Sequence, residues 1–533
     1  MSTTRWYTKP NLVIEPLFDR WYAWAHLISP ATSAMNIVNR HLKIMNSYIQ
    51  NSQIHAAAAK NPKMRGGPFV DFKEPRVEEI KALKEHTIKK HGYHIQFVEA
   101  VGELNRMLKS SARGYGMDTL YEKVPDILKG YVELVYDLNN NPSFRFFEKL
   151  LYKSKCYDET SQSIALWLTN NDERPFVLST PRLDEPDVIH VDIPFRSQAI
   201  DMLSRMRRTP GDPEAIAEAL NIKDKDRALF ETFFTREEPM AYERYTGDKI
   251  RMRYFGHACI LVETKDVSIL VDPLISYHGY TTELARYSEV NLPDKLDYVI
   301  ITHNHQDHIL FETLLSLRHK IEYLVVPKGG NGSIQDPNLK LMFTELGFKN
   351  VVEIGEFDTL AHGNCQITGV PFIGEHSDLD IRSKICHHVR IGKYTLLFAA
   401  DSCNVEPRLY HHVFNITGKV DSLFLGMECD GAPLSWLYGP LLTEDLARDM
   451  DNSRRLAGSN YTRARAMAEV FNPRELYVYA MGMEPWLEFI SSIKYTDESN
   501  PIVQSNLLIN ECLSKNIVCE RLYGEKELFY DME

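Results

Sequence analysis

The stretch His303-Asn304-His305-Gln306-Asp307-His308 constrains this chain most, because it places three imidazoles and a carboxylate within six residues. It follows the apolar run 298–301, which reads as a buried strand, and it precedes a helix-like segment at 309–315. Burying so many titratable groups together is costly unless a metal binds them. Imidazole and carboxylate suit zinc, iron or manganese, and four donors exceed what one open site usually takes from one segment. The motif therefore predicts two metals at a strand end.

The length and composition of the chain limit its class. A chain of 533 residues is too long for one ordinary core and predicts more than one domain. The net charge of -12 argues against a nucleic-acid binder that acts through overall charge. The eight cysteines form no C-x-x-C pair, and no 18-residue apolar run occurs. We therefore expect a cytoplasmic protein with no nucleic-acid or membrane partner.

The chain divides into two regions that differ in their pattern of apolar residues. Residues 1–245 contain helical patterns, at 77–84 and 143–151, and extended stretches at 175–178 and 188–193. This region carries no catalytic signature, so we expect a mixed α/β domain that serves dimerisation or covers an active site. Residues 246–533 alternate short apolar runs with turns and helical stretches. That pattern is typical of a layered α/β architecture with its site at strand ends.

Four features of the second region, in this order, resemble the metallo-β-lactamase superfamily. They are Gly256-His257-Ala258, the strand end Asp272-Pro273, the H-x-H-x-D-H loop and a strand that ends in Asp401. The resemblance implies an αββα sandwich and a two-metal site. His303 and His305 would bind the first metal, Asp307 and His308 the second, and Asp401 would bridge them. Two cations held close together need shared negative charge, which a bridging carboxylate supplies.

Two departures from the hydrolase pattern of that superfamily narrow the resemblance. Glu375 stands beside His376, where a hydrolase would place a histidine ligand, so either residue is a candidate ligand. No histidine follows His412, and the late stretch 479–485 therefore lacks the final histidine ligand. A site that is richer in carboxylate and has vacant positions favours iron and O₂ over zinc and hydrolysis.

With these departures and the long first region, the chain resembles the diiron β-hydroxylases of nonribosomal peptide assembly lines. The resemblance implies an O₂-dependent monooxygenase that acts on an aminoacyl thioester carried by a carrier domain. It implies one iron on His303, His305, Glu375 and Asp401, and another on Asp307, His308 and Asp401, with Glu375 and Asp401 as catalytic carboxylates. The electrons come from an external donor, because the chain has no flavin or nicotinamide fingerprint. An external reductase and a second copy of the chain are the other expected partners.

The main alternative is a two-zinc hydrolase of a thioester, lactone or phosphodiester, with His376 as a ligand. Three residues near the motif have no settled role. Asp272 orients a ligand histidine or makes a turn, and His257 packs near the cluster or acts in it. Glu484 replaces the missing histidine as a ligand, or the coordination position stays open. An acidic carrier would need a basic surface on this acidic chain. Two arginine clusters are candidates for it, and ordinary surface charge explains each equally well: Arg205, Arg207 and Arg208 in one, and Arg454, Arg455, Arg463 and Arg465 in the other.

Overall fold

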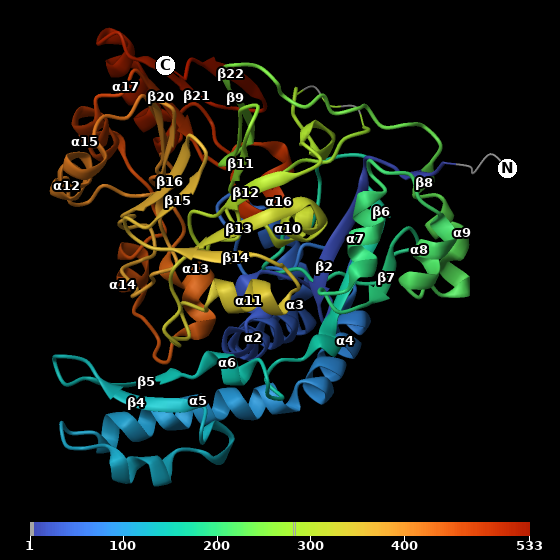
Figure 1. Ribbon diagram of the computed structural model, residues 1–533. Coiled ribbons are helices and arrows are strands. Elements are labelled where there is room, and N and C mark those ends of the chain that lie inside the picture. Colours follow the sequence, from blue (N-terminus) through green and yellow to red (C-terminus); the bar gives the residue numbers. More distant parts are fainter. Residues whose placement is uncertain (1–4, 281, 283, 533) are drawn as a thin grey trace.

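A computed structural model describes residues 5–280, 282 and 284–532 (Figure 1). Its centre is a pair of seven-stranded sheets that enclose an apolar core. The first sheet has the order β14 (Val351–Ile354), β13 (Ile321–Pro327), β12 (Leu296–Ile300), β11 (Ser268–Val271), β10 (Cys259–Glu263), β9 (Ile250–Gly256) and β22 (Lys526–Tyr530). The second has the order β15 (Thr359–His362), β16 (Cys365–Val370), β17 (Cys386–Ile391), β18 (Tyr394–Phe398), β19 (Ser422–Gly426), β20 (Glu475–Tyr479) and β21 (Val518–Arg521).

The central strands of both sheets are buried on both faces. β10, β11, β18 and β19 are buried at every residue, and strands β11 to β14 and β18 to β21 run parallel within their sheets. Parallel strands covered on both faces are expected to read as nearly continuous apolar runs. This explains why the sequence shows short apolar segments rather than alternating ones in this region.

Helices cover the outer faces of the two sheets, which gives four layers in the order α, β, β, α. α10 (Phe311–Leu317) and α11 (Leu339–Glu345) lie on the first sheet. α12 (Arg408–Thr417), α15 (Tyr461–Phe471) and α17 (Asn500–Ser514) lie on the second. Figure 1 shows α12, α15 and α17 on the left edge and α10 and α11 near the middle of the molecule.

The first region forms a mixed α/β unit beside α10. Its four-stranded sheet has the order β3 (Trp21–Tyr22), β2 (Leu12–Phe18), β6 (Gln162–Leu168) and β7 (Ile189–Asp192). β2 and α7 (Gln198–Arg205) contact α10, and one apolar cluster runs from this unit into α10 and α11. The first region therefore seals one outer face of the sandwich.

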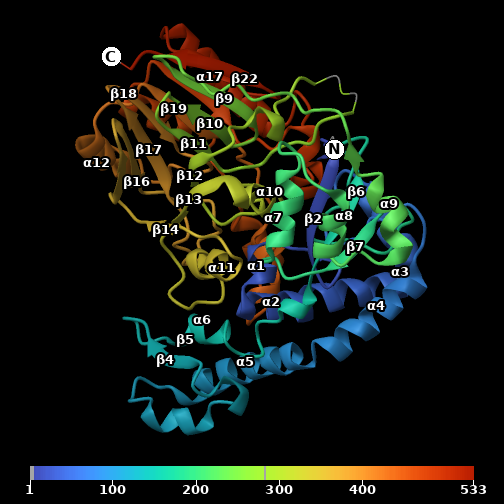
Figure 2. The same cartoon turned by 45° about the vertical axis from the view of Figure 1, so that its right-hand side comes forward.

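Three long helices and a hairpin extend from that unit. They are α3 (Leu42–Lys60), α4 (Val77–Lys90), α5 (Gly92–Ser111) and the pair β4 (Val132–Tyr136) and β5 (Pro142–Phe146). α5 and the hairpin form an arm below the sandwich in both views (Figures 1 and 2).

The local predictions in the first region had mixed outcomes. The expected helix at 77–84 is part of α4, and the extended stretch at 188–193 contains β7. The expected helix at 143–151 is wrong in its first half, because 142–146 pairs with β4 as a strand and only α6 (Glu148–Leu151) is helical. Residues 175–178 lie in a loop and turn.

All eight cysteines are free. Among the helices of the described residues, none is both long enough and apolar enough to cross a bilayer.

Candidate metal centre

The H-x-H-x-D-H loop begins directly after β12 and is tied to the end of β11. The Thr302 N–H donates to Asp272 Oδ1 at 2.7 Å, and the His308 N–H donates to the His305 carbonyl at 3.1 Å. His303, His305 and His308 are all buried. The loop is therefore a tight turn whose imidazoles point into the protein.

Four strands end at this edge in a residue with left-handed backbone. These residues are His257 after β9, Asp272 after β11, Ala400 after β18 and Ala480 after β20, with φ values of 51°, 38°, 45° and 53°. Such a conformation costs a non-glycine residue about 1–2 kcal/mol, and this strain collects at functional sites. Both sheets thus turn sharply where the metal-ligand candidates lie.

The structure brings the expected ligand residues together in two groups, one around Glu375 and one around Asp401. His305 Nδ1 lies 2.8 Å from Glu375 Oε1, and His303 Nε2 lies 3.8 Å from Glu375 Oε2. His308 Nε2 lies 3.0 Å from Asp401 Oδ2, which is also 4.0 Å from His303 Nε2. In each of the groups His303–His305–Glu375 and His303–His308–Asp401, the ligand atoms lie within 4.8 Å of one another.

Each of the three imidazoles in the loop has a partner for its outward nitrogen. His303 Nδ1 lies 3.0 Å from Thr302 Oγ1, His305 Nε2 lies 2.9 Å from the Tyr438 hydroxyl, and His308 Nδ1 lies 2.8 Å from Asp272 Oδ2. Metal-binding histidines typically donate their second N–H in this way, which directs the other lone pair at the metal. Asp272 therefore orients His308, which supports the first of its two interpretations.

The inward atoms are left without partners. His303 Nε2, Glu375 Oε2 and Asp401 Oδ1 are buried and form no hydrogen bond. Buried polar groups are normally satisfied. In the described part of the chain, no lysine or arginine forms an ion pair with Asp307, Glu375 or Asp401. The donor set and its orphaned atoms therefore fit bound cations.

The pKa values of the site residues reflect the same shortage of positively charged side chains beside the carboxylates. Burial and the neighbouring imidazoles hold the pKa of His303 well below its ordinary value. Burial raises the pKa of Glu375 to about 7, although His376 opposes the shift. Burial disfavours the charged form of His308, but the carboxylates of Asp401 and Asp272 raise its pKa well above its ordinary value. Without bound cations, the negative charge of the buried carboxylates can be neutralised only by protons on these carboxyl and imidazole groups.

Glu375 and His376 take different places in their loop. Glu375 is in a ligand group, whereas His376 belongs to none of the groups found among the described residues. The His376 ring stacks on His305 with centroids 4.3 Å apart, and its Nδ1 lies 3.0 Å from Glu375 Oε2. Gly374 permits this turn, since it has φ 80° and a Cβ there would lie 2.7 Å from Cys403 Cβ.

Comparison with known proteins extends over the whole chain. Residues 7–239 match the family described as diiron non-heme beta-hydroxylase N-terminal domain, and residues 268–431 match the beta-lactamase superfamily domain. The chain is 38% identical over 532 residues to the 4-amino-L-phenylalanyl-[CmlP-peptidyl-carrier-protein] 3-hydroxylase of Streptomyces venezuelae, and the match covers 98% of this chain and 99% of that one.

The chain belongs to the diiron β-hydroxylase family. It is similar to the crystal structure of CmlA, a diiron beta-hydroxylase from Streptomyces venezuelae, with a TM-score of 0.93, 37% identity and coverage of 99% of this chain and 100% of that one. A glutamate-to-aspartate mutant of CmlA matches with a TM-score of 0.90, 36% identity and coverage of 98% and 100%.

Membership of this family confirms the main expectations from the sequence. The fold is a metallo-β-lactamase αββα sandwich preceded by a separate mixed α/β domain. The activity is that of a diiron monooxygenase, which uses two irons, O₂ and an electron donor, and the hydrolase alternative is not supported.

Several residues of the hydroxylase site were missed or left open by the sequence analysis. His257 Nε2 lies 3.4 Å from Asp307 Oδ2, in a third group with His308. Glu484 accepts hydrogen bonds from the Tyr254 hydroxyl and the His257 N–H, so it holds backbone and is in no ligand group of the described residues. Glu428, beyond β19, is half-buried, and burial together with the carboxylates of Asp401 and Asp307 raises its pKa well above its ordinary value. The sequence signals were the strand-end histidine in G-H-A for His257 and the late stretch 479–485 without a histidine for Glu484, and Glu428 had none.

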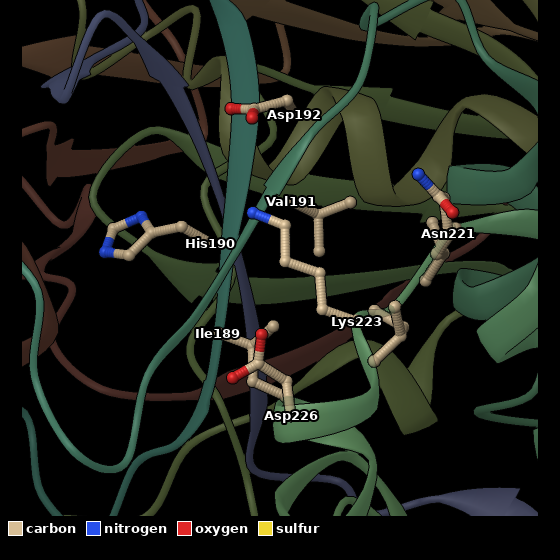
Figure 3. Close-up of a pocket in the computed structure, with 9 residues that line it drawn as sticks. Ile189, His190, Val191, Asp192, Asn221, Lys223 and Asp226 are labelled. Carbon is tan, nitrogen blue, oxygen red and sulfur yellow. The ribbon is translucent and has the colours of Figure 1, made fainter.

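A small cavity in the first region lies apart from this centre. It has a volume of about 50 Å³ and lies between β7 and the segment 220–226 (Figure 3). Its polar side chains include His190, Lys223 and Asp226. None of the metal-binding groups found among the described residues includes a residue of this cavity, so it carries no argument about the reaction.

Proposed function

We propose that the chain hydroxylates the β-carbon of an aminoacyl group held as a thioester on the carrier domain of a nonribosomal peptide synthetase. The relative from Streptomyces venezuelae is a 3-hydroxylase of an aminoacyl group on a peptidyl carrier protein, which supports the substrate class. The observation that carries the proposal is the pair of buried ligand groups that share His303, whose carboxylates form no ion pair with a lysine or arginine among the described residues.

In this proposal each iron has its own set of ligands. The first iron is held by His303 Nε2, His305 Nδ1, Glu375 and Asp401, and the second by Asp307, His308 Nε2 and Asp401. The second set is smaller, because the stretch 479–485 contributes no side chain to the ligand groups of the described residues. When bound, the irons supply the O₂ activation and C–H oxidation that no side chain can perform. The protein orients the ligands and keeps the centre largely dry.

Exposure indicates from which side the substrate reaches the centre. The Asp307 side chain is 21% exposed, whereas those of Glu375 and Asp401 are 6% and 8% exposed. The residues that would hold the second iron therefore include the more exposed carboxylate. We propose that the thioester arm enters along the Asp307 side.

Metal analysis tests the proposed function. Protein produced with iron and zinc both available should contain about two irons per chain and show an oxo-bridged diferric absorption. The reduced protein, incubated with a panel of aminoacyl carrier domains, should add one oxygen atom to one of them, as measured by mass spectrometry. Two zincs with hydrolytic turnover would overturn the proposal.

The choice between Glu375 and His376 needs its own pair of variants. Glu375→Ala should lose iron, because it removes a ligand that no neighbour replaces. His376→Ala should keep most of the iron, since the ring packs on His305 from outside the ligand groups. Iron content per chain decides the matter, and the reverse ranking would reassign the ligand.

Of the two arginine clusters, the second is the better candidate for carrier docking. Arg207 and Arg208 are already paired, with Glu289 at 2.9 Å and Asp294 at 3.3 Å. Arg454 donates to the Ser377 carbonyl at 2.9 Å, and Arg463 Nη1 lies 2.9 Å from Cys403 Sγ. These contacts anchor the cluster next to the loops that carry Glu375 and Asp401.

The charge of that cluster is available to a partner. Within the described residues, Arg454, Arg455 and Arg463 form no ion pair with a carboxylate, and Arg455 is exposed. Arg465 differs, because Glu469 and Glu511 lie at 2.9 Å and 3.2 Å from it. An acidic carrier approaching the centre would therefore meet unpaired positive charge.

Charge reversal tests the docking surface. Arg454→Glu with Arg455→Glu should raise KM for the carrier-bound substrate about tenfold or more while the iron content stays at that of the wild type. Arg474→Glu is the matched control, since Arg474 is exposed and precedes β20 at the end away from the centre. Carrier kinetics equal to those of the control would contradict this surface.

We also propose that residues 1–245 form a domain that covers the centre. Arg40 Nη2 donates to the Leu437 carbonyl at 2.9 Å, and Asn39 donates to the Pro440 carbonyl at 2.8 Å. Tyr438, between these two carbonyls, contacts His305. The first region thus holds the segment that orients one metal-ligand candidate.

The arm of α5 and the β4–β5 hairpin supports the proposed homodimer. Leu138 at the tip of the hairpin is fully exposed, and Tyr115 beyond α5 is 81% exposed. Apolar side chains on a projecting element favour contact with another protein surface. Light scattering should report a dimer for the wild type and a monomer for Leu138→Asp with Tyr115→Asp, and a dimer in both would place the interface elsewhere.

A further inference from the structure

His257 lies at the second metal position by distance alone. It ends the turn after β9, it is completely buried, and its Nε2 is 3.4 Å from Asp307 Oδ2. With Asp307 and His308 it forms one of the three groups whose ligand atoms lie within 4.8 Å of one another. Proximity would make it an additional ligand of the second iron.

The other nitrogen of the same ring excludes that role. His257 Nδ1 accepts a hydrogen bond of 3.1 Å from the Gly482 N–H. A backbone N–H can only donate, so Nδ1 must present its lone pair. In a neutral imidazole the remaining nitrogen then carries the proton. Nε2 is therefore an N–H group, which cannot bind a metal. It forms no hydrogen bond in the structure, and Asp307 Oδ2 at 3.4 Å is the acceptor within its reach.

The three loop histidines show the opposite arrangement. Their outward nitrogens face the oxygens of Thr302, Tyr438 and Asp272, all of which can accept a hydrogen bond from a ring N–H. That leaves their inward nitrogens as lone pairs. The hydrogen-bond partner of the nitrogen that points away from the centre therefore distinguishes the four histidines. His303, His305 and His308 can bind metal, and His257 cannot.

The segment that fixes His257 is the one from which hydrolases of the superfamily take their final histidine ligand. The Ala480 N–H donates to the His257 carbonyl at 2.9 Å, and the His257 N–H donates to Glu484 Oε1 at 3.0 Å. Gly482 has φ 64°, and a Cβ there would lie 3.1 Å from Ile493 Cδ1. The segment therefore holds both the backbone and the ring of His257.

We propose that His257 is a positioning residue whose Nε2–H donates to Asp307 Oδ2 and leaves the other carboxylate oxygen to bind the second iron. This rests on the proposed function, in which Asp307 is a ligand of that iron. Such a bond would fix the orientation of the carboxylate, so that Asp307 would present its other oxygen to the iron.

Two substitutions at this position separate a donor from a ligand. His257→Gln places a side-chain N–H near the position of Nε2, whereas His257→Phe keeps the ring and removes the donor. We expect His257→Gln to hold two irons per chain with the diferric absorption of the wild type. His257→Phe should bind the second iron about 10- to 100-fold more weakly, measured by competition with a chelator, and should shift the absorption.

The outcomes distinguish this inference from the proposed function. If His257→Gln loses one iron as completely as Asp307→Ala does, His257 is a ligand and the inference fails. If His257→Phe matches the wild type in affinity and absorption, His257 has no positioning role. A wild-type protein that takes up no iron would instead defeat the proposed function.

A measurement on the unsubstituted chain covers the case in which the variants do not fold. In zinc-loaded protein labelled with ¹⁵N at histidine, the imidazole signals report which nitrogen carries the proton. We expect His257, assigned in the unsubstituted chain by the coupling between its Nδ1 and the Gly482 N–H, to be protonated at Nε2. Protonation at Nδ1 or coordination of Nε2 to zinc would overturn the inference.

Discussion

Two clusters of buried charge in this hydroxylase are built from similar residues and balanced differently. In the first, Glu15 on β2 and Glu312 on α10 share Arg174, and Arg182 adds a second cation to Glu15 at 3.0 Å. In the second, Asp307, Glu375 and Asp401 face only imidazoles among their ion-pair partners in the described residues. One cluster joins two regions of the fold, and the other is open to a ligand.

The pKa values express this contrast between Glu15 and Glu375. Burial favours the protonated form of both carboxyls. At Glu15 that effect is overcome by Arg182 and Arg174, so its pKa falls below the ordinary value. At Glu375 burial prevails and the pKa rises to about 7. Because Glu375 lies among imidazoles that can act as ligands, a bound cation can supply the positive charge that its surroundings lack.

The largest expected effect is at Asp401, the carboxylate that we propose both irons share. Asp401→Ala should leave less than one iron per chain and abolish hydroxylation, because Asp401 approaches both His303 and His308. Iron analysis after chelation and reloading is the measurement. Retention of two irons would show that Asp401 is not needed to bind them, and it would contradict the view that this cluster is the one balanced by metal.

Breaking the paired cluster should lower stability rather than iron binding. Arg174→Met leaves Glu15 and Glu312 buried without that cation and should reduce the free energy of unfolding by about 3–5 kcal/mol. Arg465→Met, at an exposed pair with Glu469, should cost less than about 1 kcal/mol. Denaturant titration of the two variants compares them, and equal losses would contradict the role of burial.

An intermediate effect is expected where a carboxylate acts through a ligand. Asp272→Asn weakens the acceptor for His308 Nδ1 and should reduce affinity for iron about 10- to 100-fold. Chelator competition measures the change. Asp297→Asn is a suitable control, since Asp297 accepts from Ser268 on the same sheet, away from the centre, and its affinity should equal that of the wild type.

The smallest effect concerns Glu148, a carboxyl with neither a cation nor a metal. Burial raises its pKa to about 7, while the Asn338 N–H opposes the shift. Because the folded-state pKa is raised, its stabilising contribution is present below the ordinary value near 4.5 and is lost as pH rises through about 7. Between pH 5 and 8, Glu148→Gln should lose about 1–2 kcal/mol less stability than the wild type. Parallel pH profiles of unfolding would refute this.

Sequence reasoning reached the centre where the signal was local. The loop 303–308 holds four candidate ligands in six residues after one strand. Asp401 follows an apolar strand that could be recognised directly. Glu375 was chosen over His376 only through family resemblance, because adjacent residues offer no spacing argument. Its separation from His376 depends on three-dimensional packing.

Contacts between distant segments could not be predicted from the sequence. The bond from Gly482 to His257 spans 225 residues, and the contacts from Arg40 to the 436–440 segment span nearly 400. The error at 143–146 has a local cause, since Ser143-Phe144-Arg145-Phe146 alternates with the period of a strand and runs into the helical segment 148–151. Pairing with β4 makes 143–146 a strand, although the helical pattern of 148–151 follows directly.

The position of β22 sets the order in which the enzyme can mature. β22 pairs with β9, the strand that leads to His257, and the segment 480–484 must be in place before that histidine is held. During synthesis, the ribosome makes the loop 303–308 more than 200 residues before β22. The hydrogen bonds that hold His257 can therefore form only after nearly the whole chain has been made, long after the segment 303–401 that carries the candidate ligands.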